Sequence, residues 1–167
     1  HAIDHFGRID VLINNAGMVK SRVLAHTTND DWHALLTANL SSAFFTTRAV
    51  WPVMTSQFEA AGKNGEGGVI VNISSRAAHD PFPGLGAYAI AKIGVNMLTR
   101  VAAREGAPVG IRVVAIAPGA VDTEMFQGLV GKQNVKPAEV LQPQDVAAMI
   151  ADVVAGSLRN SAGETLY

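Results

Sequence analysis

The chain has 167 residues, of which 49% are hydrophobic and 16% are charged, with a formal net charge of -1 and no cysteine. This length suits one domain or part of one, and the many apolar residues suit a sheet covered by helices on both faces. The scattered basic residues give no nucleic-acid or membrane-surface footprint, the lack of cysteine excludes disulfides and thiolate metal sites, and no apolar run could span a membrane, so we expect a cytoplasmic protein with a neutral small-molecule partner.

The first third of the chain predicts a buried strand followed by a long helix. Residues 9–14 are rich in branched apolar side chains and stop at a tight turn, Asn15-Ala16-Gly17. From Thr28 onward, polar capping candidates precede apolar residues that recur at helical spacing as far as Val50. We expect one long helix here, bent before Pro52.

Strands and helices continue to alternate along the rest of the chain. A polar glycine-rich loop at 60–68 precedes a predicted strand at 69–75, and further strands are predicted at 111–117 and 163–167. Helices are predicted over 87–105 and 143–154, whereas residues 119–136 show no strong period. The alternation predicts a parallel sheet with right-handed crossovers, whose ligands bind beyond the carboxyl ends of the strands.

Tyr88 and Lys92 lie four residues apart on a predicted helix, so their side chains project from one face. A nearby ammonium group favours the phenolate and lowers the pKa of a tyrosine, which makes Tyr88 usable as a proton donor or acceptor. The ends of three predicted strands converge on the same edge of the sheet, at Asn14 to Gly17, Ser74-Ser75 and Pro118-Gly119.

These residues occur in the same order in the short-chain dehydrogenase/reductase family, which the chain resembles. Members of this family are single-domain Rossmann-fold oxidoreductases that use a nicotinamide cofactor. The interval of 13 residues between Ser75 and Tyr88 is typical of that family and favours Ser75 over Ser74. The resemblance covers nearly the whole chain and implies a Rossmann-like, doubly wound parallel sheet in a three-layer α/β/α arrangement. The matching residues are Asn14-Asn15-Ala16-Gly17, Asn39, Ser75, Tyr88, Lys92, and Pro118-Gly119 with Val121 and Thr123.

The resemblance implies hydride transfer between NAD or NADP and a carbonyl compound or secondary alcohol. Tyr88 would exchange a proton with the substrate oxygen, and Ser75 would orient that oxygen. Lys92 would hold the ribose hydroxyls and lower the pKa of Tyr88, while Asn39 would position a water that links Lys92 to solvent. The implied cofactor contacts are Asn15, Ala16, Gly17, Tyr88, Lys92, Pro118, Gly119, Val121 and Thr123.

Each match also has a purely structural interpretation. The Asn14 to Gly17 segment could be a simple turn, Asn39 a surface residue, Ser75 a strand-end hydroxyl and Thr123 a helix cap. No metal site is predicted, because the five histidines show no paired ligand spacing. The resemblance further implies a homo-oligomer, a dimer or tetramer, in which the two long helices pair between subunits. The aromatic residues Phe44, Phe45, Trp51 and Phe58 are expected in the core or at a helix interface.

The family's glycine-rich turn, which receives the cofactor pyrophosphate at a helix N-terminus, has no counterpart in these 167 residues. We therefore expect residues 1–167 to be a single partial domain, the C-terminal part of a larger enzyme that carries the catalytic residues. Taken alone, this portion is predicted to bind no dinucleotide tightly. It is also predicted to be unstable, because the strand at 11–14 would lack its inner neighbour.

The leading functional hypothesis is an NAD(P)-dependent oxidoreductase similar to the 3-oxoacyl carrier-protein reductase branch. Its substrate lid is expected within 119–136, with apolar contacts from Met125, Phe126, Leu129 and Val130. The alternative is a non-catalytic binding or scaffold protein of the same fold. A hydrolase using Ser75 would need a partner histidine, and the sequence identifies no acid that could orient His79.

Overall fold

The structure is a computed structural model that describes residues 2–62, 65–134, 138 and 140–167. Four parallel strands form one sheet in the order β1-β2-β3-β4, as predicted from the alternation of strands and helices. The register pairs Val11 with Val69 and Val69 with Arg112, so the strands end close to one level. The strands are β1 (Val11–Asn14), β2 (Gly68–Ile73), β3 (Ile111–Ile116) and β4 (Thr165–Leu166).

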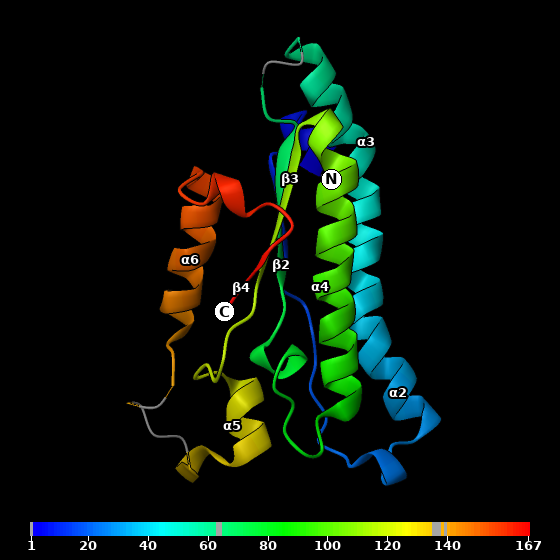
Figure 1. Cartoon of the computed structure of the whole chain (residues 1–167), viewed down its shortest axis with the longest axis vertical. Helices are drawn as coiled ribbons and strands as arrows, with labels where there is room; N and C mark the ends of the chain where they lie inside the picture. Colours follow the sequence, from blue (N-terminus) through cyan, green and yellow to red (C-terminus); the bar gives the residue numbers. More distant parts are fainter. Residues whose placement is uncertain (1, 63–64, 135–137, 139) are drawn as a thin grey trace.

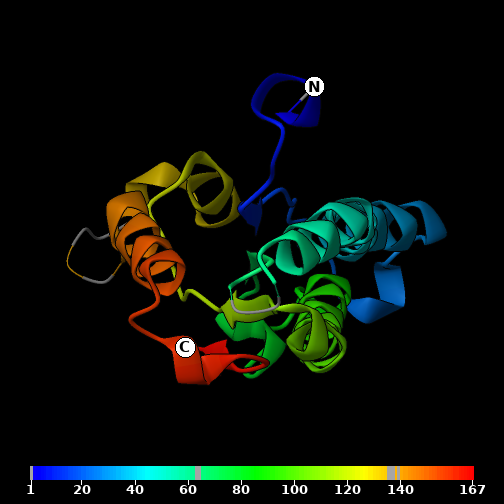
Figure 2. The same cartoon turned by 90° about the horizontal axis from the view of Figure 1, so that it is seen from above.

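Helices cover both faces of the sheet, which confirms the predicted α/β class and its three layers (Figures 1 and 2). On one face α3 (Ser42–Ala60) and α4 (Gly86–Gly106) pack over a core that includes Met54, Ile70 and Val113. On the other face α6 (Pro143–Ala155) packs over Val71 and Val114. Neighbouring residues of β2 and β3 point to opposite faces and are buried on both, which explains why these strands are apolar except for Asn72 and Arg112.

The predicted long helix is a continuous helical run over residues 29–60, with one π-helical turn before Pro52. A capping box formed by Thr28 and Asp31 begins α2 (Asn29–Leu36), a π-helical turn follows at Thr37–Ser41, and α3 continues to Ala60. Pro52 lies inside α3, where the lost hydrogen bond costs about 3 kcal/mol. Val50 and Met54 beside it are buried against the sheet, and this packing offsets the cost.

The segment after β3 contains a helix that the sequence did not predict, α5 (Glu124–Val130). Its seven residues make only about two turns, too short for a periodic pattern to stand out. Thr123 caps its start, and Gly131 ends it with a φ of +85°. Within predicted segments, Lys63 and Asn64 of the glycine-rich loop and Val135 and Lys136 after it lie outside the described residues, as does His1.

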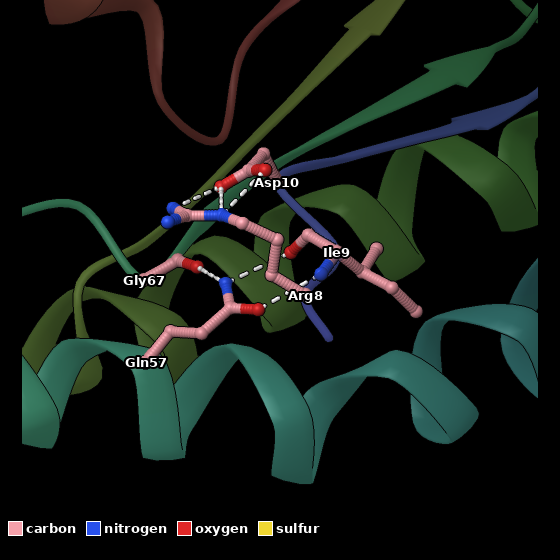
Figure 3. Close-up of polar contacts among 5 residues, drawn as sticks. All are labelled: Arg8, Ile9, Asp10, Gln57 and Gly67. Carbon is pink, nitrogen blue, oxygen red and sulfur yellow. Dashed lines mark hydrogen bonds and ion pairs between the residues drawn. The ribbon is translucent and has the colours of Figure 1, made fainter. Parts of the chain in front are cut away.

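Gln57 of α3 fixes the start of β1, which pairs with β2 alone among the strands of the described residues (Figure 3). Its amide oxygen accepts from the Ile9 N–H at 2.8 Å, and its amide nitrogen donates to the carbonyls of Ile9 at 2.9 Å and Gly67 at 2.8 Å. Arg8 and Asp10 flank this contact with a bidentate ion pair. One side chain thus gives the Ile9 backbone N–H and carbonyl the partners that buried backbone groups need.

Candidate active site

The carboxyl ends of β1, β2 and β3 point toward the lower end of the molecule in Figure 1, where α4 begins and α5 lies. Backbone hydrogen bonds hold the segments that follow β2 and β3 together. The Ser74 N–H donates to Ile116 O at 2.7 Å, and the Arg76 N–H donates to Pro118 O at 2.9 Å. Ser75 therefore lies beside the Pro118-Gly119 segment, as expected from a parallel sheet.

Three of the predicted site residues lie close together beside the carboxyl end of β2: Tyr88, Ser75 and Lys92. The Ser75 side chain is close enough to the phenol of Tyr88 to favour its ionised form, and its hydroxyl accepts from the Ala77 N–H at 3.1 Å. The Lys92 Nζ lies 5.7 Å from the centre of the Tyr88 ring and donates to Ile73 O at 2.8 Å. Ser74, which the spacing to Tyr88 disfavours as the catalytic serine, donates to the Lys92 carbonyl oxygen at 3.2 Å and so anchors α4.

The pKa values of Tyr88 and Lys92 are both shifted, and that of Tyr88 differs from the sequence expectation. Burial raises the pKa of Tyr88 above its ordinary value, and the Ser75 side chain acts in the opposite direction. Burial also lowers the pKa of Lys92 to about 8. The expected lowering of the Tyr88 pKa by Lys92 is therefore wrong for this structure, because desolvation dominates and the ammonium is directed to Ile73 O. At neutral pH Tyr88 is a neutral phenol, able to donate a proton.

Asn39 is buried in the π-helical turn and does not lie on the surface. Its amide nitrogen donates to Met18 O and to Leu35 O, each at 2.9 Å, and its amide oxygen accepts from the Met18 N–H at 3.2 Å. A Cβ added at Gly17 would lie 2.6 Å from the Asn39 Oδ1 and 3.6 Å from the Lys92 Nζ. Gly17, Asn39 and Lys92 thus converge, and π-turns are often found at functional positions.

A buried polar network beneath the site was not predicted from the sequence. The Asn14 amide nitrogen donates to Asn72 Oδ1, and the Asn72 amide nitrogen donates to Thr99 Oγ1, both at 2.8 Å. The hydroxyl of Thr46 donates to Asn14 Oδ1 at 2.6 Å. The network joins α3, β1, β2 and α4, and it fixes the helix that carries Tyr88 against the strand ends. The two asparagines in otherwise apolar strands, Asn14 and Asn72, were the feature of the sequence that could have revealed this network.

The other predicted cofactor residues surround the same end of the sheet. Asn15, Ala16 and Gly119 are exposed, Pro118 and Val121 are half-buried, and Val121 forms a bridge with Leu141. The Thr123 hydroxyl accepts from the Phe126 N–H at 3.3 Å, so the capping interpretation of Thr123 holds. Whether it also contacts a cofactor stays a prediction.

A hollow of about 410 Å³ separates the turn after β1 from α5. Gly17, Met18 and Ser21 line one side, and Met125 and Leu129 line the other. Two of the four predicted lid residues therefore face this hollow, whereas Phe126 and Val130 are not among its lining residues. The turn residue Gly17 connects the hollow to Asn39 and Lys92.

His79 packs its ring against Tyr167, with the ring centres 5.7 Å apart, and has no hydrogen bond to Ser75 among the described contacts. Within the described ranges, no three histidine, aspartate or glutamate side chains are grouped so that they could hold a metal ion. No helix in the described part of the chain has the length and apolar character needed to cross a membrane.

A sequence profile of short chain dehydrogenases matches residues 1–134. The chain belongs to the short-chain dehydrogenase family. It is 37% identical over 151 residues to a 3-oxoacyl-(acyl-carrier-protein) reductase of Synechocystis sp., covering 89% of this chain and 58% of that protein. The corresponding reductase of Thermotoga maritima is 36% identical over 154 residues, with 89% and 59% covered.

Among solved structures, the chain is similar to the 3-ketoacyl-(acyl-carrier-protein) reductase of Brucella melitensis, crystallised in complex with NADH. The two share 28% sequence identity with a TM-score of 0.87, over 99% of this chain and 67% of the Brucella protein. The dehydrogenase chain thus spans about three fifths of the length of the two curated relatives. The fold and the family predicted from the sequence are confirmed by these comparisons.

Proposed function

We propose that this short-chain dehydrogenase is an oxidoreductase that transfers a hydride between a nicotinamide cofactor and a carbonyl or secondary alcohol carbon. The observation that carries the proposal is the placement of the Ser75 hydroxyl and the Lys92 ammonium beside Tyr88 at the carboxyl edge of the sheet. A hydroxyl pair that can bind one substrate oxygen and exchange a proton with it is the arrangement that carbonyl reduction needs.

The residues at this edge fit the nicotinamide end of NAD or NADP. The hollow of about 410 Å³ lies next to Gly17, and Gly119 has open space where a side chain would stand, which allows a ligand to approach the backbone. We assign Asn15, Ala16, Gly17 and the segment from Pro118 to Thr123 to holding this end. When bound, the cofactor supplies or accepts the hydride.

Tyr88 acts in this mechanism as the proton donor for reduction. Its raised pKa keeps the phenol protonated at neutral pH, so the proton is present when negative charge develops on the substrate oxygen. Ser75 donates a second hydrogen bond to the same oxygen and orients it. In the reverse direction Tyr88 accepts the alcohol proton, and the rate of oxidation should increase with pH.

Lys92 and Asn39 return the proton to Tyr88. The pKa of Lys92, about 8, lies close to the working pH of most enzymes, so its ammonium can give up and regain a proton readily. Asn39 lies at the other side of Gly17, and a water held between Asn39 and Lys92 would connect the ammonium to solvent. Lys92 also binds the ribose hydroxyls in this proposal, because two of its three N–H groups are not used by Ile73 O.

The substrate class follows the relatives. The Synechocystis and Thermotoga proteins are named as 3-oxoacyl-(acyl-carrier-protein) reductases, and the Brucella protein binds NADH. The side chains of Met125 and Leu129 offer an apolar wall that suits an acyl chain. We therefore propose a 3-oxoacyl thioester or a similar ketone as substrate, with NAD or NADP as cofactor, in the cytoplasm.

An exposed apolar face on the long helices favours a homo-oligomer. Ile90, Ile93, Met97 and Val101 follow each other at intervals of three or four residues along α4, and each is between 43% and 54% exposed. Phe44 and Phe45 are also exposed on α3, which lies beside α4 in Figures 1 and 2. Pairing this face with a second copy would remove these side chains from water.

The experiment is a comparison of the full-length protein with its Tyr88→Phe variant, using a 3-oxoacyl thioester with NADH or NADPH. The variant should lose roughly 100- to 10,000-fold of the turnover number, the usual contribution of a general acid, while its melting temperature stays unchanged. A variant that keeps its rate would show that Tyr88 does not transfer the proton. A folded wild type that neither binds cofactor nor turns over would favour the non-catalytic scaffold.

A further inference from the structure

Asp31, in the first turn of α2, is a buried carboxylate that the proposed mechanism does not use. Its side chain is only 6% exposed, and it forms ion pairs with Lys20 and Arg22 of the segment that follows β1. The Arg22 Nε lies 2.9 Å from Asp31 Oδ2, and the Lys20 Nζ contacts Asp31 Oδ1. A carboxylate is buried at little cost only when its oxygens are paired, so these contacts fix the two cations as well as Asp31.

Asp31 also holds the beginning of α2. Its backbone N–H donates to the Thr28 hydroxyl at 3.1 Å, and its Oδ2 accepts from the Thr28 N–H at 3.3 Å. The hydrogen bond with Lys20 is the main cause that lowers the pKa of Asp31 to about 2, although burial acts in the opposite direction. Asp31 therefore stays ionised at neutral pH and connects a capped helix end to the segment after β1.

The two cations alternate with residues that line the hollow between the turn after β1 and α5. Val19 and Ser21 line that hollow. Lys20 and Arg22, which alternate with them in sequence, contact Asp31 instead. This is the alternation of an extended segment, whose successive side chains point to opposite sides. Asp31 thus lies behind the side of the hollow that Val19 and Ser21 form.

The segment 18–22 is attached to the rest of the site at both of its ends. The Asn39 amide nitrogen donates to Met18 O at 2.9 Å, and the Arg22 N–H donates to Gly84 O at 2.7 Å. Gly84 belongs to the loop that precedes α4, the helix of the proposed proton donor. The position of this side of the hollow is therefore coupled to the position of that helix.

Between those two ends, Asp31 supplies the polar support. In the described part of the chain, the contact between Lys20 and Asp31 is the only hydrogen bond or ion pair that residues 19–21 form. Removing the charge of Asp31 would leave Val19 and Ser21 held at the ends of the segment alone. They could then move relative to the apolar side chains of α5 on the opposite side of the hollow.

We propose that Asp31 is a positioning residue for substrate binding, because it fixes the side of the hollow that Val19 and Ser21 form. Asp31 touches neither the substrate nor the reacting atoms, so proton and hydride transfer do not depend on it directly. Its loss should raise KM and leave kcat unchanged, the pattern of weakened substrate binding. This positioning role rests on the proposed function, since that function assigns the hollow to the substrate.

The test is steady-state kinetics of the full-length Asp31→Asn variant with 3-oxobutanoyl coenzyme A and NADH or NADPH. Asparagine keeps the size of the side chain and an oxygen that can accept from the Thr28 N–H, but it removes the charge. KM for the thioester should rise roughly tenfold, as for loss of one charge-assisted hydrogen bond, while kcat and the Kd of the cofactor stay within about twofold. Asp30→Asn, at an exposed position in the same helical turn, is the matched control and should change none of them.

Two further variants separate positioning of the segment from capping of α2. Lys20 and Arg22 are nearly half exposed, so Lys20→Gln and Arg22→Gln remove the same ion pairs while leaving α2 intact. Each should raise KM, and combining either with Asp31→Asn should add less than the sum of the separate effects. Hydrogen exchange should become faster at the Arg22 amide in Asp31→Asn and stay unchanged at the Arg76 amide, which donates to Pro118 O.

Turnover of the wild type separates this positioning role from the proposed function. A wild type without turnover would contradict the proposed function and the positioning role with it. An active wild type whose Asp31→Asn variant keeps its KM would overturn the positioning role alone, as would unchanged exchange at the Arg22 amide. If Asp31→Asn does not fold, Lys20→Gln and Arg22→Gln decide, because an unchanged KM in both would overturn it equally.

Discussion

Asn39 and Met18 are joined by two hydrogen bonds that link the π-helical turn to the segment after β1. The Asn39 amide nitrogen donates to Met18 O at 2.9 Å, and its amide oxygen accepts from the Met18 N–H at 3.2 Å. The buried amide of Asn39 thus pairs with the backbone of Met18 as a neighbouring strand would. It holds the turn that leads from Gly17 against Lys92, so the geometry of the candidate active site depends on it.

Replacing Asn39 with leucine should destabilise the protein. The change keeps the approximate volume but leaves the half-buried N–H and carbonyl of Met18 without their partner, which costs about 1–3 kcal/mol. We expect the free energy of unfolding in urea to fall by that amount. Asn29→Leu, at an exposed position in the first turn of α2, is the control. Equal stability of the two variants would show that the pair with Met18 contributes nothing.

Replacing Gly17 with alanine should displace Asn39. The new Cβ would lie 2.6 Å from Asn39 Oδ1, closer than carbon and oxygen can approach, so one of the two must move. We expect loss of stability of about 1–3 kcal/mol, together with weaker binding of NADH or NADPH. Gly65→Ala, at an exposed position outside the hollow, is the matched control, because a Cβ there would make only an ordinary contact, at 3.4 Å from the Ala61 Cβ. Thermal melting and fluorescence titration with each cofactor measure both effects.

The buried ammonium of Lys92 should make stability increase with pH. The folded pKa of about 8 is below the ordinary value of 10.5, so between these values the unfolded chain binds more protons than the folded one. The free energy of unfolding should therefore rise from pH 8 to pH 10, by on the order of 1–3 kcal/mol. The ammonium form, present below pH 8, carries the cost of burial.

Lys92→Met should remove this pH dependence, and the exposed Lys132→Met should keep it. Urea unfolding at pH 7, 8, 9 and 10 gives the comparison. If the difference in stability between wild type and Lys92→Met stays constant over this range, Lys92 does not titrate with a lowered pKa. Both variants retain Tyr88, so its titration above pH 10 affects them equally.

Replacing Gln57 with leucine should release the start of β1. The backbone N–H and carbonyl of Ile9 and the carbonyl of Gly67 would all lose a partner. We expect a loss of about 1–3 kcal/mol in unfolding free energy and faster hydrogen exchange at the Ile9 amide. Gln133→Leu, at an exposed position, is the control. Slow exchange at Ile9 in the Gln57→Leu variant would contradict the anchoring role shown in Figure 3.

Patterns that repeat along the chain made most of the fold predictable. The apolar strands around Leu12, Ile70 and Val113 and the amphipathic α4 were located because burial on both faces, or on one face of a helix, leaves a clear period. The short α5 was not, because two turns are too few to show a period.

The sequence by itself determined the parallel α/β fold, the family and the residue types that gather at the carboxyl ends of the strands. Spacing along one helix was enough to pair Tyr88 with Lys92. Only the tertiary structure decided that Lys92 donates to Ile73 O, that burial raises the pKa of Tyr88, and that Asn39 is bound to Met18. Proton affinity depends on solvent exclusion and on partners distant in sequence, and neither can be deduced from the local pattern of residues.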